Sequence, residues 1–286
     1  MPIRDYAEFV DVTYRCRYLR PGLVTPPYRR TTYSLIEKRL EAARPALLKH
    51  VRMMARYRDR LIEIARSPVT AAQTEAHFGP EFSNWDACLM YALIRNYKPK
   101  KIIEVGSGNS TRWMRQAIID EGLDTRIVVV DTGVKNPWTP AIADEIIPEH
   151  FEDIWDDSRL QLETGDMFFY DGSHFVVPGS DLMMFCLEYV PRLPAGVFLH
   201  FHDVFPPGDG PDALRQVMIF EAYLVYAMLL YGNLEWVCSV WPLRAEANTT
   251  LSKQATRIFP PFPPEMDVQQ YGGSFWVQTP RQGGAE

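Results

Sequence analysis

Lys101 to Thr111, with the sequence KIIEVGSGNST, is a short apolar run that passes directly into a Gly-x-Gly turn. The run has the composition of a buried strand, and the residues behind the turn predict a helix over Thr111 to Glu121. Gly106 and Gly108 tolerate the backbone angles of a sharp strand-to-helix turn and let a ligand approach closely. The first amides of that helix lack helical partners, so they offer a seat for a carboxylate or phosphate.

Ser110 and Asp131 narrow the class of ligand. Ser110 or Thr111 supplies a hydroxyl that we expect to cap the helix. Ser110 also stands where the third glycine of the dinucleotide fingerprint would admit a pyrophosphate, which argues against NAD. The next predicted strand, Arg126 to Val130, leads into Asp131, about twenty residues beyond the turn, where a nucleotide fold places the acid that holds ribose hydroxyls. Together these signals favour a nucleoside without phosphates.

The bulk composition is that of a globular protein. With 286 residues and 47% hydrophobic composition, the chain can bury a sizeable core. A net charge of -6 argues against nucleic acid as a partner, although Arg15 to Arg30 is locally basic. The four cysteines have no CxxC spacing, so neither a zinc knuckle nor a disulfide framework is indicated. We expect a cytoplasmic protein without membrane contact, because the amino terminus lacks a long apolar core and Val217 to Tyr231 is too short to cross a bilayer.

The order of the predicted elements defines the fold class. Alternating strands and helices after Pro99 predict an α/β, doubly wound, Rossmann-like sheet that is mostly parallel with an antiparallel last strand. Helical patterns over Tyr33 to Ser67 and Asn84 to Tyr97 precede it. The expected strands are Lys101 to Val105, Arg126 to Val130, Glu145 to Pro148, Met167 to Tyr170, Val197 to Phe201, Trp236 to Val240 and Ser274 to Gln278, and the further helices are Asp153 to Leu162, Ser180 to Val190 and Asp212 to Tyr231.

We divide the chain into an N-terminal helical cap, residues 1–75, and a catalytic domain, residues 76–286. Between Tyr14 and Arg30 the cap is rich in tyrosine and arginine. It could therefore form a lid over an aromatic or anionic substrate, or a plain helical cover on the sheet.

Polar side chains follow two strands that we expect to be neighbours. Asp171 and His174 come after the fourth strand, and His202 and Asp203 come after the fifth. Ligands of open α/β sheets bind at this edge, so two carboxylates and two imidazoles should face one cavity. They could transfer a proton, since an unperturbed imidazole has a pKa of about 6.5, or bind a divalent cation through Asp171, His202 and Asp203. His200 would support this site or pack in the sheet.

Three further acids have separate expectations. Asp166 opens the fourth strand at the opposite edge of the sheet, so we interpret it as structural. Glu152 or Asp153 could meet an exocyclic adenine amine, and Asp153 could equally be a helix N-cap.

Five aromatic residues could form a wall of the substrate cavity, although core packing also explains them. They are Trp138, Trp155, Phe175, Tyr223 and Tyr226.

Four separated segments resemble the class I S-adenosylmethionine (SAM)-dependent methyltransferases, particularly a bacterial group with the methyltransferase-24 type of domain. The resemblance spans most of residues 77–279, and its most distinctive part is Asp-Gly-Ser-His followed by His-x-His-Asp. The segments are DACLMYALIRNYKPKKIIEVGSGNST (86–111), GDMFFYDGSHFVVPGSD (165–181), LPAGVFLHFHDVF (193–205) and GGSFW (272–276).

The resemblance implies that SAM is the cofactor. Gly106 and Gly108 would lie against its methionine part, and Asp131 would hold the ribose hydroxyls. Glu104 would orient the glycine turn or reach the amino group of the cofactor through water. The implied cofactor site comprises Glu104, Gly106, Ser107, Gly108, Ser110, Asp131, Glu152, Asp153 and Asp171.

The resemblance also implies methyl transfer to a small-molecule hydroxyl or amine, which we expect to belong to specialised metabolism. His202 or His174, with Asp171, or a metal ion held by Asp171, His202 and Asp203, would take the proton of the acceptor. One alternative is attack on the aminocarboxypropyl carbon of SAM, which releases methylthioadenosine. The other is a catalytically inactive binding protein, against which the four polar side chains argue. A homo-oligomer is compatible with the sequence.

Overall fold

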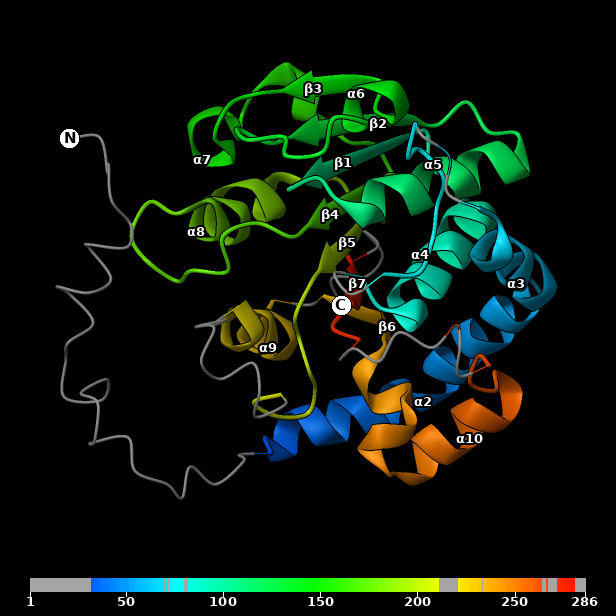
Figure 1. Cartoon of the computed structure of the whole chain (residues 1–286). Helices are drawn as coiled ribbons and strands as arrows, with labels where there is room; N and C mark the ends of the chain where they lie inside the picture. The colour runs from blue at the N-terminus through cyan, green and yellow to red at the C-terminus, as the bar shows by residue number, and fades with distance from the viewer. Residues whose placement is uncertain are drawn as a thin grey trace, which may run out of the picture.

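The computed structural model describes residues 32–68, 70, 72–79, 82–210, 221–232, 234–263, 266 and 272–280. Within these residues the chain forms one seven-stranded sheet (Figure 1). The strands are β1 (Lys101–Val105), β2 (Arg126–Val130), β3 (Glu145–Ile147), β4 (Met167–Tyr170), β5 (Phe198–Phe201), β6 (Glu235–Ser239) and β7 (Phe275–Gln278).

The strand order is β3-β2-β1-β4-β5-β7-β6. The first five strands run parallel to one another, and β7 lies antiparallel between β5 and β6. The winding reverses between β1 and β4, where open α/β sheets bind their ligands. The predicted doubly wound, Rossmann-like sheet with an antiparallel last strand is confirmed.

Helices cover both faces of the sheet, with α4 and α5 on one side and α8 and α9 on the other (Figure 1). Two buried apolar clusters correspond to these two faces. The longer helices are α2 (Ser34–Ala55), α3 (Arg58–Arg66), α4 (Asn84–Tyr97), α5 (Asn109–Glu121), α9 (Glu221–Tyr231) and α10 (Thr250–Ile258), and the single-turn helices are α6 (Thr139–Ile142), α7 (Phe151–Ile154) and α8 (Asp181–Met184).

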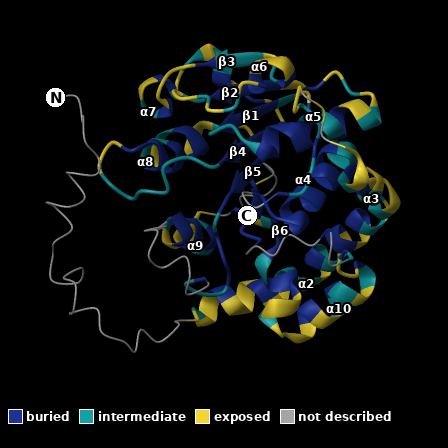
Figure 2. Ribbon diagram, viewed as in Figure 1, coloured by how far each residue is buried: buried dark blue, intermediate teal, exposed yellow. Residues whose placement is uncertain are grey.

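The residues of β1 show how the sheet is built. Ile102 packs in the cluster under α4 and α5, whereas Ile103 and Val105 pack in the cluster under α8 and α9. Because side chains alternate along a strand, Glu104 points to the same face as Ile102, toward α5. The inner strands β1, β4, β5 and β7 are almost entirely buried, as Figure 2 shows, so their sequences are mainly apolar. A buried acid in such a strand needs partners from the helix above it.

The helical pattern over Tyr33 to Ser67 forms two helices, α2 and α3. Leu40, Leu47 and Val51 of α2 belong to the same buried cluster as the helices on that face of the sheet. The tyrosines and arginines between Tyr14 and Arg30 lie outside the described residues. The division of the chain at residue 75 therefore stays a prediction.

Several predicted boundaries are wrong, for local reasons. α5 begins at Asn109, so Ser110 and Thr111 lie inside the helix and Gly108 occupies the cap position. The helix expected over Asp153 to Leu162 is broken, because the Asp157 carboxylate accepts the Arg159 N–H and starts a separate turn at Ser158–Leu160. Asp153 is therefore a helical residue of α7 and not an N-cap.

Two other helices also differ from the expectation. The segment predicted over Ser180 to Val190 starts with α8, capped by the Ser180 hydroxyl, and continues as a wider turn over Phe185–Tyr189 and a tighter one over Val190–Arg192. Of the helix expected over Asp212 to Tyr231, α9 is the described part, and residues 212–220 lie outside the described residues.

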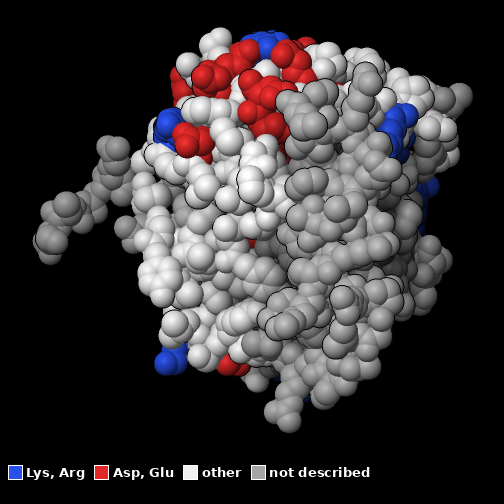
Figure 3. Space-filling view, turned by 90° about the vertical axis from the view of Figure 1, so that its left-hand side faces the viewer, with Lys and Arg blue, Asp and Glu red and all other residues white. Residues whose placement is uncertain are grey.

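The surface that Figure 3 shows carries its acidic side chains mainly around the end of the sheet where β3 and α7 lie. In the described part of the chain, no helix combines the length and apolarity that a membrane crossing requires. The acids of this region of the sequence are Asp144, Glu145, Glu149, Glu152, Asp153, Asp156 and Asp157.

Candidate functional site

The glycine turn joins β1 to α5. Gly106 has a φ of +81°, and a Cβ built on it would lie 2.2 Å from the carbonyl oxygen of Asp171. Glycine is therefore required here by the backbone conformation, as the sequence predicted, and also by the passing chain. A Cβ on Gly108 would meet no atom within 4 Å, so this is the glycine that leaves open space at the turn.

Glu104 holds the turn from below. Its carboxylate is fully buried and accepts hydrogen bonds from the hydroxyls of Ser110, at 2.5 Å, and Thr111, at 2.6 Å. Burial raises the pKa of Glu104 to about 8, although these two hydrogen bonds oppose the shift. Thr111 in turn accepts the Gly108 N–H. Of the two roles expected for Glu104, the observed bonds are those of a residue that orients the turn.

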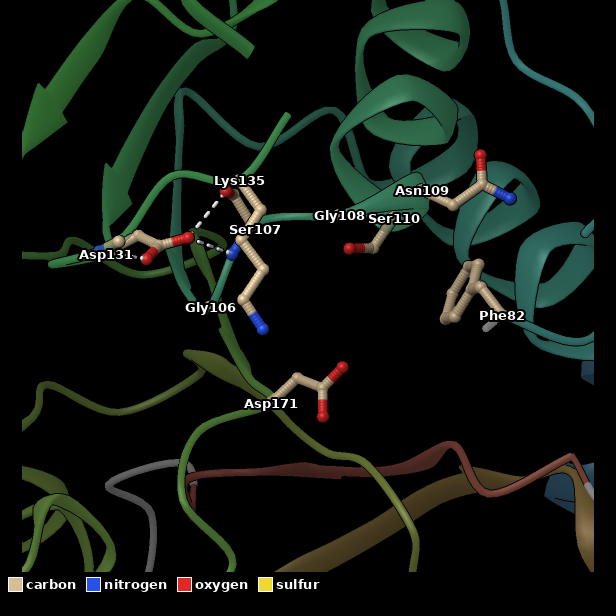
Figure 4. Close-up of a pocket in the computed structure, with 10 residues that line it drawn as sticks. Phe82, Gly106, Ser107, Gly108, Asn109, Ser110, Asp131, Lys135 and Asp171 are labelled. Atoms are coloured by element: carbon tan, nitrogen blue, oxygen red, sulfur yellow. Dashed lines mark hydrogen bonds between the residues drawn. The ribbon is translucent and has the colours of Figure 1, made fainter. Parts of the chain in front are cut away.

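Asp131 closes the turn from the side of β2. Its Oδ2 accepts the Ser107 N–H at 3.0 Å and the Ser107 hydroxyl at 2.6 Å, and its Oδ1 accepts the Gly133 N–H at 2.9 Å. Figure 4 shows the Ser107 contacts at one end of the cavity. Asp131 thus stands at the predicted place, already oriented by three donors, with its carboxylate at the cavity wall.

A cavity of about 270 Å³ lies over this turn. It is the size of a site for a small molecule. In Figure 4, Asp171 directs its carboxylate into the cavity from below, and the side chain of Lys135 descends over the glycine turn. The lining residues are Phe82, Gly106, Ser107, Gly108, Asn109, Ser110, Asp131, Gly133, Lys135 and Asp171. The sequence did not predict four of them, Phe82, Asn109, Gly133 and Lys135. For Gly133 and Lys135, their places two and four residues after Asp131 were the available signal.

Beside the cavity, the predicted polar residues come together as an acid–imidazole cluster of Asp171, His174, His202 and Asp203. His174 Nε2 lies 3.5 Å from Asp171 Oδ1 and 3.9 Å from Asp203 Oδ2. His202 Nδ1 lies 3.4 Å from Asp203 Oδ1 and 3.9 Å from Asp171 Oδ1. These distances agree with the expectation that the four side chains lie together. They do so because β4 and β5 are neighbouring strands.

Two carboxylates that the sequence analysis did not assign to the site complete the cluster. Glu221 of α9 contacts His174 Nδ1 through Oε1 and is fully buried. Asp86 of α4 lies with Oδ2 3.9 Å from His202 Nε2. Asp86 is itself fixed, because it accepts hydrogen bonds from the Ser83 hydroxyl and the Ser274 N–H. A charged residue at the start of each otherwise apolar helix was the signal that could have found them.

The backbone at the cluster is strained. His174 has a φ of +65° and Asp203 a φ of +58°, a left-handed conformation that side chains with a Cβ rarely adopt. Gly273 lies so close that a Cβ on it would meet the Asp203 backbone N at 2.7 Å. Strain of this kind tends to gather at functional sites, where the surrounding structure maintains it.

The carboxylates govern the protonation of both imidazoles. Burial lowers the pKa of His174, but the charges of Glu221, Asp171 and Asp203 outweigh it and raise the pKa to about 9. For His202 burial acts in the same way, and Asp171, Asp203 and Asp86 raise the pKa well above its ordinary value. Burial raises the pKa of Asp203, yet the neighbouring imidazoles bring it below its usual range. Both imidazoles therefore hold a proton near neutral pH.

The expected divalent cation finds no prepared site here. Among the described residues, no group of three or more His, Cys, Asp or Glu is arranged to hold a metal ion. The oxygens of Asp171 and Asp203, which were expected as ligands together with His202, face imidazole nitrogens instead. The donors present therefore do not fit the group, and no step is derived through a metal.

His200 and Asp166 are both buried and both have structural roles. His200 is fully buried, stacks on Phe169 with ring centroids 3.7 Å apart, and contacts the Ser274 hydroxyl, so it packs in the sheet. Asp166 accepts the backbone N–H groups of Lys100 and Lys101 at the amino edge, which confirms its structural role.

Glu152 and Asp153, the two candidates for the adenine contact, are not among the residues that line the cavity. Asp153 is exposed, whereas Glu152 is half-buried and burial raises its pKa. The aromatic wall expected from five residues is not found at the cavity. Trp138 packs on Arg112, Trp155 on Arg192, and Tyr223 and Tyr226 on Tyr33, and Phe175 is not among the lining residues.

A family model described as a methyltransferase domain, Methyltransf_24, matches residues 103–204. These residues hold the end of β1, all of β2 to β5, the glycine turn, Asp131 and the four residues of the acid–imidazole cluster. This segment is therefore similar to a methyltransferase domain, and the predicted resemblance to the class I methyltransferases is confirmed. Phe82, Asp86 and Glu221 lie outside the matched residues. No curated protein sequence matches the chain.

Solved structures show partial likeness. The methyltransferase PaMTH1 of Podospora anserina, solved with bound S-adenosylhomocysteine (SAH), is 14% identical over 89% of this chain and 98% of that chain, with a TM-score of 0.40. A putative O-methyltransferase from Klebsiella pneumoniae is 12% identical over 94% and 95%, with a TM-score of 0.33. The Mg-SAM structure of cmcI is 12% identical over 53% of this chain and 62% of that chain, with a TM-score of 0.38. The fold class rests on the strand order and not on these superpositions.

Proposed function

We propose that the protein transfers a methyl group from SAM to a hydroxyl or amine of a small molecule. The observation that carries this proposal is the cavity over the glycine turn, with Asp131 at one end and the carboxylate of Asp171 aimed into it. It lies at the reversal point of the sheet, and its lining residues other than Phe82 belong to the segment that matches the methyltransferase domain. A role in specialised metabolism stays a prediction.

The residues of the cavity fit SAM. Gly108 leaves the open space that a ligand needs to approach the turn, since a Cβ there would meet nothing within 4 Å. Asp131 is held by Ser107 and Gly133 in an orientation suited to ribose hydroxyls, as a carboxylate that can accept further hydrogen bonds. Ser110, where a third glycine would admit a pyrophosphate, contributes its hydroxyl to Glu104 and disfavours NAD.

When bound, SAM supplies a methyl group on a sulfonium, whose leaving group is a neutral thioether. The residues of the chain orient the reactants and take up a proton from the acceptor. Asp171 is placed to position the acceptor, because its carboxylate both lines the cavity and lies near His174 and His202. His202 or His174 takes the proton in its neutral form. Since the carboxylates raise the pKa of both imidazoles, this role strengthens as the pH rises.

Asp86 and Glu221 have a positioning role in this proposal. Glu221 fixes the His174 ring through its contact with Nδ1 and thereby sets which ring nitrogen faces Asp171 and Asp203. Asp86 lies 3.9 Å from His202 Nε2, beyond hydrogen-bond distance, so it acts on that imidazole through its charge. Each carboxylate is buried by a helix outside the matched domain.

Product analysis tests the proposal. The protein is incubated with SAM and a panel of small hydroxyl and amine compounds, and the nucleoside products are separated. Methyl transfer releases SAH, whereas attack at the aminocarboxypropyl carbon releases methylthioadenosine. We expect SAH together with a methylated acceptor. Methylthioadenosine as the product would replace the proposal with its alternative, and SAM binding without any product across the panel would favour an inactive binding protein.

A further inference from the structure

Phe82 forms one end wall of the cavity. Its side chain is 2% exposed, yet it is among the residues that line the cavity. In Figure 4 its ring lies at the end remote from Asp131, with the Ser110 hydroxyl and the Asp171 carboxylate facing the same space. The aromatic ring thus closes one end of the cavity, whose polar groups come from the glycine turn and from the residue that follows β4.

The ring is held firmly from behind. It packs edge-to-face on Phe169 of β4, with ring centroids 5.9 Å apart, and against the imidazole of His202 at 5.7 Å. The next residue, Ser83, caps α4 by accepting the Asp86 N–H. Because its neighbours are the sheet, a helix start and the acid–imidazole cluster, the ring has a fixed orientation between the cavity and the reacting groups.

The shape of SAM brings its charge to this ring. This step rests on the proposed function, in which the ribose lies at Asp131. The sulfonium is one carbon removed from the ribose and continues into the methionine part, which would lie along the glycine turn toward Phe82 and Asp171. The face of an aromatic ring attracts a cation through its quadrupole, and the attraction is strongest where water is excluded. SAH has the same shape without the charge or the methyl group.

We propose that Phe82 is a specificity-determining residue that contacts the sulfonium of SAM and thereby distinguishes SAM from SAH. The ring binds the charged cofactor more tightly than the neutral product. After methyl transfer the attraction is lost, which helps SAH to leave. Phe82 precedes the matched domain, so this discrimination is contributed by the segment that enters α4.

Titration calorimetry on the full chain tests the proposal. The Kd values of SAM and SAH are measured for the wild type, for Phe82→Leu and for Phe82→Met, with folding checked by circular dichroism. We expect either replacement to raise the Kd of SAM by about 5- to 30-fold, which corresponds to about 1–2 kcal/mol, and that of SAH by less than about threefold. Leucine and methionine fill the space of the ring differently. If one of the two variants fails to fold, the other still gives the ratio of the two Kd values.

Phe78→Leu is the matched control. Phe78 belongs to the same region but stacks on Trp113 and packs on Phe262, away from the cavity. It should leave the ratio of the two Kd values unchanged. Equal weakening of SAM and SAH by Phe82→Leu would show that the ring is only an apolar wall, and would overturn this inference while leaving the proposed function intact. A wild type that binds neither nucleoside would overturn both.

Discussion

The two halves of the site are built in different ways. The cofactor half, at the glycine turn and Asp131, consists of two short stretches that directly follow β1 and β2, and most of its hydrogen bonds run between near neighbours in the chain or between these two loops. The reaction half gathers its carboxylates and imidazoles from α4, from the ends of β4 and β5, and from α9. One half is local in sequence, and the other depends on the whole fold.

The halves also differ in how they manage charge. The Asp131 carboxylate is balanced by backbone N–H groups and a hydroxyl, which are neutral donors. In the reaction half, four carboxylates surround two imidazoles, and these carboxylates raise the pKa values of both imidazoles. We therefore expect the reaction half to respond to pH as the His174 imidazole loses its proton around its pKa of about 9.

The largest expected effect comes from His202→Gln, which removes an imidazole from the reaction half. Turnover should fall by about 10²- to 10⁴-fold, the range typical of a lost general base. Methyl transfer from labelled SAM at saturating acceptor measures it. His150→Gln is the matched control, since the His150 side chain is 64% exposed and its recorded partner is Glu152. Equal turnover in His202→Gln and His150→Gln would remove His202 from the reaction.

His174 should make the stability of the protein depend on pH. Burial lowers its pKa, but Glu221 and the two aspartates raise it from 6.5 to about 9. A raised folded-state pKa adds stability that is fully present below about pH 6.5 and lost as the pH rises through about 9. Wild type should exceed His174→Gln by on the order of 3 kcal/mol at pH 6, and the difference should shrink toward pH 10.

Guanidinium unfolding curves at pH 6, 8 and 10 measure this difference. If the gap between wild type and His174→Gln stayed constant across that range, the imidazole would not carry the shifted charge that its three carboxylate neighbours predict.

The smallest expected effect comes from Glu104→Gln in the cofactor half. Burial raises the pKa of Glu104 to about 8, so the carboxyl holds a proton at pH 7 and glutamine closely imitates it. The Kd of SAM should change by less than about threefold. Glu104→Ala, which leaves the hydroxyls of Ser110 and Thr111 without their acceptor, should weaken SAM binding by about tenfold. Calorimetry that found both variants equally damaged would show that Glu104 acts as a charge.

The cofactor half could be predicted from the sequence because its residues lie close together along the chain. The apolar run, the glycine turn and Asp131 are each recognisable within a few residues, and strand alternation places them at one edge of the sheet. The reason for Gly106 was nevertheless hidden, because the chain that passes it belongs to Asp171, far along the sequence. Helix starts were also misplaced where a side chain, such as that of Asp157, captured a backbone N–H.

The reaction half could be predicted only in part. The neighbouring ends of β4 and β5 brought Asp171 and His174 toward His202 and Asp203, as the order of a doubly wound sheet requires. Asp86, Glu221 and Phe82 reach the site through the packing of α4 and α9, which no periodic pattern specifies. The same packing turned the carboxylates toward imidazoles, so that the ligand set expected for a metal ion did not form.

The Kd of SAM tests the division of the site into a cofactor half and a reaction half most directly. It is measured by titration calorimetry for wild type, Asp131→Asn and His202→Gln. Wild type should bind SAM in preference to NAD. Asp131→Asn should weaken SAM binding by about 10- to 100-fold, as expected when a hydrogen-bonding carboxylate is lost, and His202→Gln should change it by less than about threefold. A wild type that gives no heat with SAM, or a His202→Gln variant that loses as much affinity as Asp131→Asn, would contradict the account.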